Sequence, residues 1–171
     1  MSPHFRPLLA AAAVALALAP VLLSPARAAG VKVTFPDAER YADAGATSWE
    51  REATQAELAA HLVALGQRLL PADLTLEVEV LEIDLAGTVL PTRRGDLRIV
   101  RGGADWPRLT LRYSLVKDGQ VQTAATERLA DLAYTMNLGS RLSSEPLRYE
   151  KRLLDDWFRE RFAERLVAAV R

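Results

Sequence analysis

Apolar and polar residues alternate along several short stretches of the chain, and a period of two residues is typical of strands buried on one face. Pro36 ends the first stretch, and Asp118-Gly119 between the last two predicts a tight antiparallel turn. The predicted strands cover residues 31–35, 74–85, 96–100, 108–116 and 120–132. Residues 88–95 are predicted to form a loop or a ragged edge segment, and residues 133–144 a loop.

The longest predicted strand contains a change of phase. Apolar residues occupy the even positions from Leu74 to Val80 and the odd positions from Leu81 to Leu85. A slip of one residue would turn the core face of the strand toward solvent. The sequence therefore predicts a β-bulge near Val80-Leu81, with a strand end buried on both faces as the alternative.

Two stretches show helical spacing instead. Thr54 and Glu57 have the spacing of a capping box, so the first helix is expected to begin there, after a loop that runs to about Ala53. Pro71 marks its end. The apolar face of this helix carries Leu58, Leu62, Leu65 and Leu69.

The second helix is expected from Glu145 to Val170, with Ser144 as its cap and Pro146 in its first turn. Opposite charges recur on its polar side at four-residue spacing, as in Arg152 and Asp156. Its apolar stripe consists of Leu147, Leu153, Leu154, Trp157, Phe158, Phe162, Leu166 and Val170. An amphipathic helix docked on a sheet therefore explains most of the aromatic residues in this segment.

This order of elements predicts an α+β fold. Runs of strands closed by helices favour an antiparallel sheet of about four to five strands, with the two helices packed on one face. No repeat and no internal linker interrupts residues 29–171, which are expected to form a single domain.

The first 28 residues are expected to be a secretory signal peptide. A basic start containing Arg6 precedes an apolar run from Leu8 to Leu23, and Ala26-Arg27-Ala28 is a small-x-small cleavage site. Cleavage after Ala28 would leave no stable membrane anchor. Because the chain has no cysteine, disulfides are excluded, and the sequence favours a periplasmic or secreted protein of a Gram-negative bacterium.

Charge and composition argue against several functions. Loss of Arg6 and Arg27 with the leader leaves 20 basic against 22 acidic residues, so nucleic acid is not an expected partner. His61 is then the one remaining histidine, and we expect neither a metal site nor a cofactor. No nucleophile motif or phosphate-binding glycine loop is present.

Five motifs together resemble the DUF3016 family of bacterial secreted or periplasmic proteins, which has no assigned function. They are VTFPDAERYAD, LEIDLAG, DWPRLTLRYSL, ERLADLAY and LRYEKRLLDDWF. The resemblance covers residues from about Val31 to Phe162. It implies a single-domain envelope protein and supplies no catalytic residues.

The candidate binding residues form two groups that are distant in sequence. Trp106 is held extended by the following proline, and an aromatic residue beside an arginine is typical of a binding hot spot. The predicted patch consists of Asp105, Trp106, Arg108, Arg148, Tyr149 and Glu150. The alternative is that Trp106 closes the end of the core while Arg108 pairs with an acid.

The sequence therefore predicts a non-enzymatic binding module whose partner is another envelope protein, a peptide or a lipid-like ligand. One alternative is a hydrolase of envelope polymers that uses Asp84, Asp105 or Asp131, since each lies at a strand end. The other is a structural or stress-associated protein without a fixed ligand. The sequence does not determine the oligomeric state.

Overall fold

The computed structural model describes residues 30–93 and 95–168, and for residues 163–168 it describes the backbone alone. The predicted signal peptide and its cleavage site lie outside the described residues, as does the predicted helix end at Val170. The strands are β1 (Gly30–Thr34), β2 (Leu74–Asp84), β3 (Thr88–Thr92), β4 (Gly95–Ile99), β5 (Arg108–Lys117) and β6 (Gln120–Ala130). The helices are η1 (Ala38–Arg40), α1 (Ser48–Leu69), η2 (Tyr134–Met136), α2 (Leu138–Leu142) and α3 (Arg148–Ala168).

The predicted α+β class is confirmed, but the main sheet is mixed rather than purely antiparallel. Its strand order is β1-β2-β5-β6, and β1 runs parallel to β2 whereas the other pairs are antiparallel. The reason is topological, because α1 connects β1 to β2 and a strand–helix–strand crossover returns the chain in the same direction. Strands β3 and β4 form a separate two-stranded sheet.

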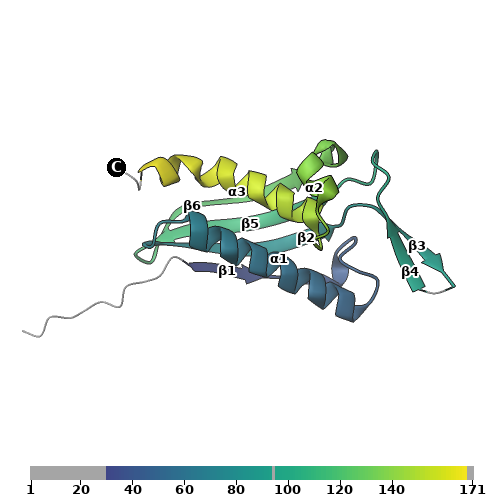
Figure 1. Cartoon of the computed structure of the whole chain (residues 1–171). Coiled ribbons are helices and arrows are strands. Elements are labelled where there is room, and N and C mark those ends of the chain that lie inside the picture. The colour runs from purple at the N-terminus through teal and green to yellow at the C-terminus, as the bar shows by residue number, and fades with distance from the viewer. Residues whose placement is uncertain (1–29, 94, 169–171) are drawn as a thin grey trace, which may run out of the picture.

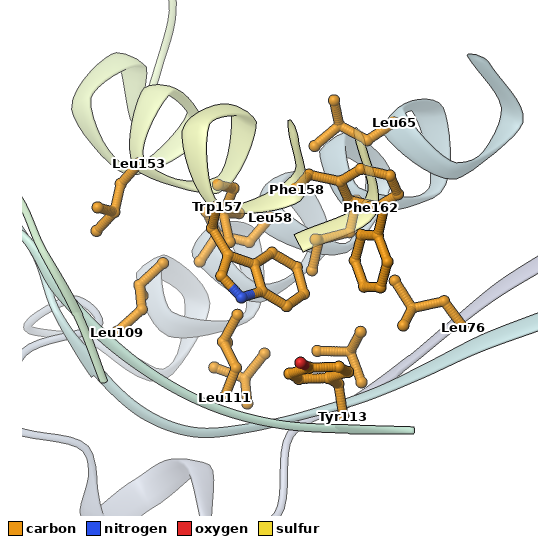
Figure 2. Packing of buried hydrophobic residues seen from close by; sticks show 14 of the residues in the cluster. Leu58, Leu65, Leu76, Leu109, Leu111, Tyr113, Leu153, Trp157, Phe158 and Phe162 are labelled. Carbon is orange, nitrogen blue, oxygen red and sulfur yellow. The ribbon is translucent and has the colours of Figure 1, made fainter. Parts of the chain in front are cut away.

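One face of the main sheet carries the core. Figure 1 shows α1 and α3 lying side by side over this face, with the β3–β4 hairpin projecting from one end of the molecule. In Figure 2, Trp157 and Phe162 point from α3 toward Tyr113 on the sheet. Most of the predicted stripes are buried, namely Leu58, Leu62, Leu65, Leu153, Leu154, Trp157, Phe158 and Phe162. Leu69 and Leu147 are partly buried against the same core, and Leu147 precedes α3 instead of lying on it. Leu166 and Val170 lie outside the described side chains.

The local irregularities follow the sequence closely. The β2–β5 register shifts between Val80 and Glu82, which confirms the predicted bulge. Asp118 and Gly119 both take positive φ angles, 50° and 78°, at the turn between β5 and β6. An Asp-Gly pair suits this turn because it tolerates left-handed backbone better than most dipeptides do.

Both long helices begin at a residue other than the one predicted. The cap of helix α1 lies seven residues earlier than predicted, at Thr47 instead of Thr54, because Thr47 and Glu50 form the capping box and Thr54 is buried inside the helix. Helix α3 starts at Arg148, directly after Leu147, whose φ of 53° is left-handed. Ser144 is therefore not its cap.

The two predicted loops also contain structure. Residues 88–92 and 95–99 form β3 and β4, which pair Thr88 with Ile99 and Thr92 with Gly95. Residues 134–142 form η2 and α2, two short helical segments that lead into α3. None of the helices in the described part of the chain is long and apolar enough to cross a membrane.

Candidate functional site

A bidentate ion pair fixes the hairpin against the body of the protein. Arg98 on β4 donates from its two terminal nitrogens to the carboxylate of Asp43, at 2.7 and 2.8 Å. Burial alone would lower the pKa of Arg98, but the hydrogen bonds and charge of Asp43 raise it. The backbone of Asp43 is itself anchored to the end of β2, through hydrogen bonds to Ile83 and Leu85. A two-stranded hairpin is marginal by itself, so this pair sets its position.

Between the hairpin and α1 lies a cleft of about 380 Å³, which we call the hairpin cleft. The first turns of α1 form one wall, the hairpin forms the other, and Pro146-Leu147 closes one end. Its lining residues are Gly45, Ala46, Trp49, Glu50, Ala53, Thr54, Glu57, Leu85, Val89, Asp96, Arg98, Pro146 and Leu147. A mostly apolar concave surface with a few charged groups is the usual form of a binding site.

Two residues give the hairpin cleft its chemical character. Trp49 lines it while remaining 74% exposed, which is unusual for so large an apolar side chain. The side-chain carboxylate of Asp96 has no hydrogen-bonding or ion-pair partner within the part of the chain that the structure describes. By contrast, Glu57 is held by Lys151 at 2.6 Å and Glu50 by the amide of Thr47 at 3.0 Å. The cleft therefore offers an aromatic surface beside an unengaged carboxylate.

The structure brings the predicted patch residues to one end of the molecule. Trp106 packs with Tyr149 in a small apolar cluster that also contains Ala86, Val100 and Tyr134. Arg108 forms an ion pair with Asp84, and its guanidinium carbon lies 5.5 Å from the centroid of the Trp106 ring. Most of this cluster is internal, because Tyr134 and Tyr149 are buried.

Asp105 organises the loop that carries Trp106. One carboxylate oxygen accepts from the hydroxyl of Tyr134 at 2.7 Å, and the other from the amide of Arg101 at 3.0 Å. The Tyr134 hydrogen bond, followed by that from Arg101, lowers the pKa of Asp105. Burial and the same carboxylate raise the pKa of Tyr134 to about 12. The tyrosine therefore stays protonated and donates throughout the physiological range.

Glu150 lies deepest in the predicted patch, with 3% of its surface exposed. Its carboxylate accepts from the amide of Ala86 at 2.7 Å, which joins α3 to the chain between β2 and β3. Burial raises its pKa, against the opposing effects of that hydrogen bond and of the charges on Arg98 and Arg148. A side chain so enclosed fixes the geometry around it, and whether it also contacts a ligand stays a prediction.

The three acids considered for hydrolysis each have a partner in the structure. Asp84 pairs with Arg108, and Asp105 holds Tyr134. Asp131 accepts from the amide two residues ahead at 2.9 Å, which is the usual turn role of aspartate. His61 lies between α1 and α3, where its Nε2 is 2.9 Å from a carboxylate oxygen of Asp155. Among the described residues, no three His, Asp or Glu side chains gather closely enough to hold a metal ion.

Sequence reasoning missed the residues that shape the hairpin cleft. Trp49 was assigned to a loop because the apolar spacing of α1 begins only at Leu58. Arg98 and Asp43 are 55 positions apart, so no local pattern could pair them. The available signal was the second capping-box spacing at Thr47 and Glu50, which would have placed Trp49 on the first turn of a helix.

Comparison with known families gives one match. Residues 29–160 match the model of a family described as a protein of unknown function, DUF3016. No curated protein and no solved structure matches the chain at a significant level.

Proposed function

The chain belongs to the DUF3016 family, whose description names no function, and from that premise we propose that it is a non-enzymatic binding module of the bacterial cell envelope. The observation that carries this proposal is the hairpin cleft, with Trp49 exposed on one wall. The proposed location rests on the leader-like residues 1–28 at the start of the sequence.

The chemistry of the hairpin cleft favours one kind of occupant, an extended peptide segment of another envelope protein. Val89, Leu85 and Leu147 offer apolar contacts for its side chains. Asp96 supplies a negative charge that no described residue neutralises, and Trp49 supplies an aromatic face beside it. Carboxylate and indole together attract a lysine or arginine side chain, so the segment is expected to carry a basic residue next to an apolar one.

A random peptide library displayed against the protein lacking its predicted leader would test this proposal. We expect the wild type to enrich peptides with adjacent basic and apolar residues. Trp49→Ala is expected to lower the affinity of an enriched peptide tenfold or more, since an aromatic hot spot contributes at least about 2 kcal/mol. Val121→Ala removes a similarly exposed apolar side chain from β6 and serves as the matched control.

Charge reversal makes the test specific for the hairpin cleft. Asp96→Lys should shift the enriched peptides from basic to acidic residues, because Asp96 lies on an exposed hairpin strand and the change leaves the core intact. The proposal is wrong if the wild type enriches no consensus, or if Trp49→Ala and Asp96→Lys enrich the same peptides as the wild type.

A further inference from the structure

A second recess, which we call the arginine pocket, lies at the start of α3. It has a volume of about 400 Å³ and is lined by Val100, Arg101, Thr135, Met136, Arg141, Arg148 and Tyr149. The three arginines come from three separate segments, the loop after β4, helix α2 and the first residue of α3. No carboxylate is among the lining residues.

The three arginines of this pocket have no carboxylate at ion-pair distance. None of them forms an ion pair within the described part of the chain, whereas Arg98, Arg108 and Arg112 each do. The two nearby carboxylates are engaged elsewhere, Asp105 with Tyr134 and Glu150 with Ala86. Arg101 and Arg148 interact electrostatically with Asp105 and Glu150, but no carboxylate enters the pocket to form an ion pair there.

Arg148 adds a second observation. Its Nε atom is buried and has no hydrogen-bonding partner, the one such side-chain atom among the described residues. Its guanidinium carbon lies 4.7 Å from the centroid of the Tyr149 ring, and this contact holds the side chain in place. Buried donors are nearly always satisfied in folded proteins, so an unsatisfied one calls for an acceptor. Oxygen atoms of a bound anion would supply it.

An exposed apolar surface lies beside the arginine pocket, on η2, α2 and the loop before them. We call it the apolar rim, and it consists of Leu132, Met136, Leu138 and Leu142, which are 67–84% exposed. Leu138 and Leu142 are one helical turn apart and share a face of α2, while Met136 also lines the pocket. Figure 1 shows α2 beside the N-terminal end of α3.

We propose that the arginine pocket binds the phosphate of an anionic phospholipid headgroup and that the apolar rim rests in the surface of the same membrane. Arginine forks match phosphate oxygens, and the three positive charges exceed the charge of about −2 that a phosphate monoester carries. A pocket for a free soluble anion would not explain four exposed apolar side chains at its edge. Exposed apolar side chains beside basic residues are the usual arrangement of a protein that lies on an anionic membrane surface.

Vesicle sedimentation tests this proposal, with phosphatidylcholine vesicles prepared with and without phosphatidic acid. The wild type is expected to bind only the anionic vesicles, and less tightly as salt is raised. Arg141→Ala and Arg101→Ala remove exposed side chains and should each weaken binding about tenfold or more. Arg68→Ala makes the same charge change at the far end of α1 and should bind as the wild type does.

Calorimetry with inorganic phosphate distinguishes anion binding by the arginine pocket from membrane contact by the apolar rim. The double variant Leu138→Gln/Leu142→Gln should lose vesicle binding at least tenfold while retaining wild-type affinity for inorganic phosphate. Arg141→Ala should weaken both vesicle binding and phosphate binding. Equal binding to neutral and anionic vesicles, an equal loss in Arg68→Ala, or phosphate binding without vesicle binding would each overturn the proposal. Circular dichroism of every variant shows that the fold is retained.

Discussion

Replacement of Glu127 on β6 is expected to destabilise the protein more than any other single loss of an acidic side chain. Its carboxylate accepts three hydrogen bonds, from the hydroxyl of Tyr113 at 3.0 Å, from the indole nitrogen of Trp157 at 3.1 Å and from Nε of Arg161 at 2.8 Å. Glu127 thus joins β5 and β6 to α3 at the edge of the core.

The size of the loss follows from the burial of the three donors. Trp157 is 4% exposed, and an indole N–H donates once, so Glu127→Ala leaves that donor unsatisfied at a cost of about 1–3 kcal/mol. The hydrogen bond from Tyr113, which is 6% exposed, adds about 1 kcal/mol. Arg161 lies at the surface, where water replaces its partner, and is left out of the estimate. The expected total is about 2–4 kcal/mol.

Urea denaturation followed by tryptophan fluorescence would measure this difference. With an m-value of about 2 kcal/mol/M for a domain of this size, the midpoint should fall by about 1–2 M. Glu79→Ala removes an exposed acid that pairs with Arg112 at 2.8 Å, and should change stability by less than about 1 kcal/mol. The reasoning is refuted if the free energies of unfolding of Glu127→Ala and Glu79→Ala agree within about 0.5 kcal/mol, which is the usual error of such comparisons.

The same residue predicts how stability depends on pH. Burial alone would raise the pKa of Glu127, but the hydrogen bonds from Arg161, Tyr113 and Trp157 hold it below its ordinary value. Its contribution is therefore complete above the pKa of the unfolded state and is lost as pH falls through the lower folded pKa. Glu127→Gln should flatten the acidic limb of the stability curve, and an unchanged limb would contradict this assignment.

Three further predictions concern the hairpin, α1 and α3. Arg98→Ala should raise amide hydrogen exchange in residues 88–99 and remove about 1–3 kcal/mol of local stability, because it breaks the bidentate pair with Asp43; unchanged exchange there would contradict this. Gly66→Ala places a Cβ 2.1 Å from Cγ2 of Val31, so it should lower stability by about 1 kcal/mol, and adding Val31→Ala should restore it in a double-mutant cycle. Glu150→Gln should gain stability over the wild type as pH rises through the raised pKa of Glu150, and a constant difference in urea unfolding at each pH would exclude the effect.

Features that depend on neighbouring residues could be predicted from the sequence. The phase change at Val80-Leu81 and the Asp118-Gly119 turn are examples, because side-chain alternation and backbone tolerance are local properties. The predicted start of α1 was wrong because the sequence offers two capping boxes: Thr47 and Thr54 each precede a glutamate by three positions. In the folded chain the first pair forms the capping box, and Thr54 of the second pair is buried within α1.

Features that join distant segments could not be read from the sequence. The structure brings the predicted patch residues to one end of the molecule. The sequence could not show that Tyr149 and Glu150 are buried there while Arg148 lines a pocket. The parallel pairing of β1 with β2 could have been predicted, because a helix lies between these two strands in the sequence. The partners of Arg98 and Glu127 depend on the completed tertiary structure and have no counterpart in local pattern.

The β3–β4 hairpin also gives the fold room to diverge. It is an excursion between two strands that are already neighbours, since Asp84 at the end of β2 and Arg108 at the start of β5 pair in register. The free energy needed to close such an excursion rises only with the logarithm of its length. Residues can therefore be gained or lost at the hairpin tip while the four-stranded sheet is inherited intact. We expect this arm to be where relatives of the protein differ most in length, and where new binding preferences arise first.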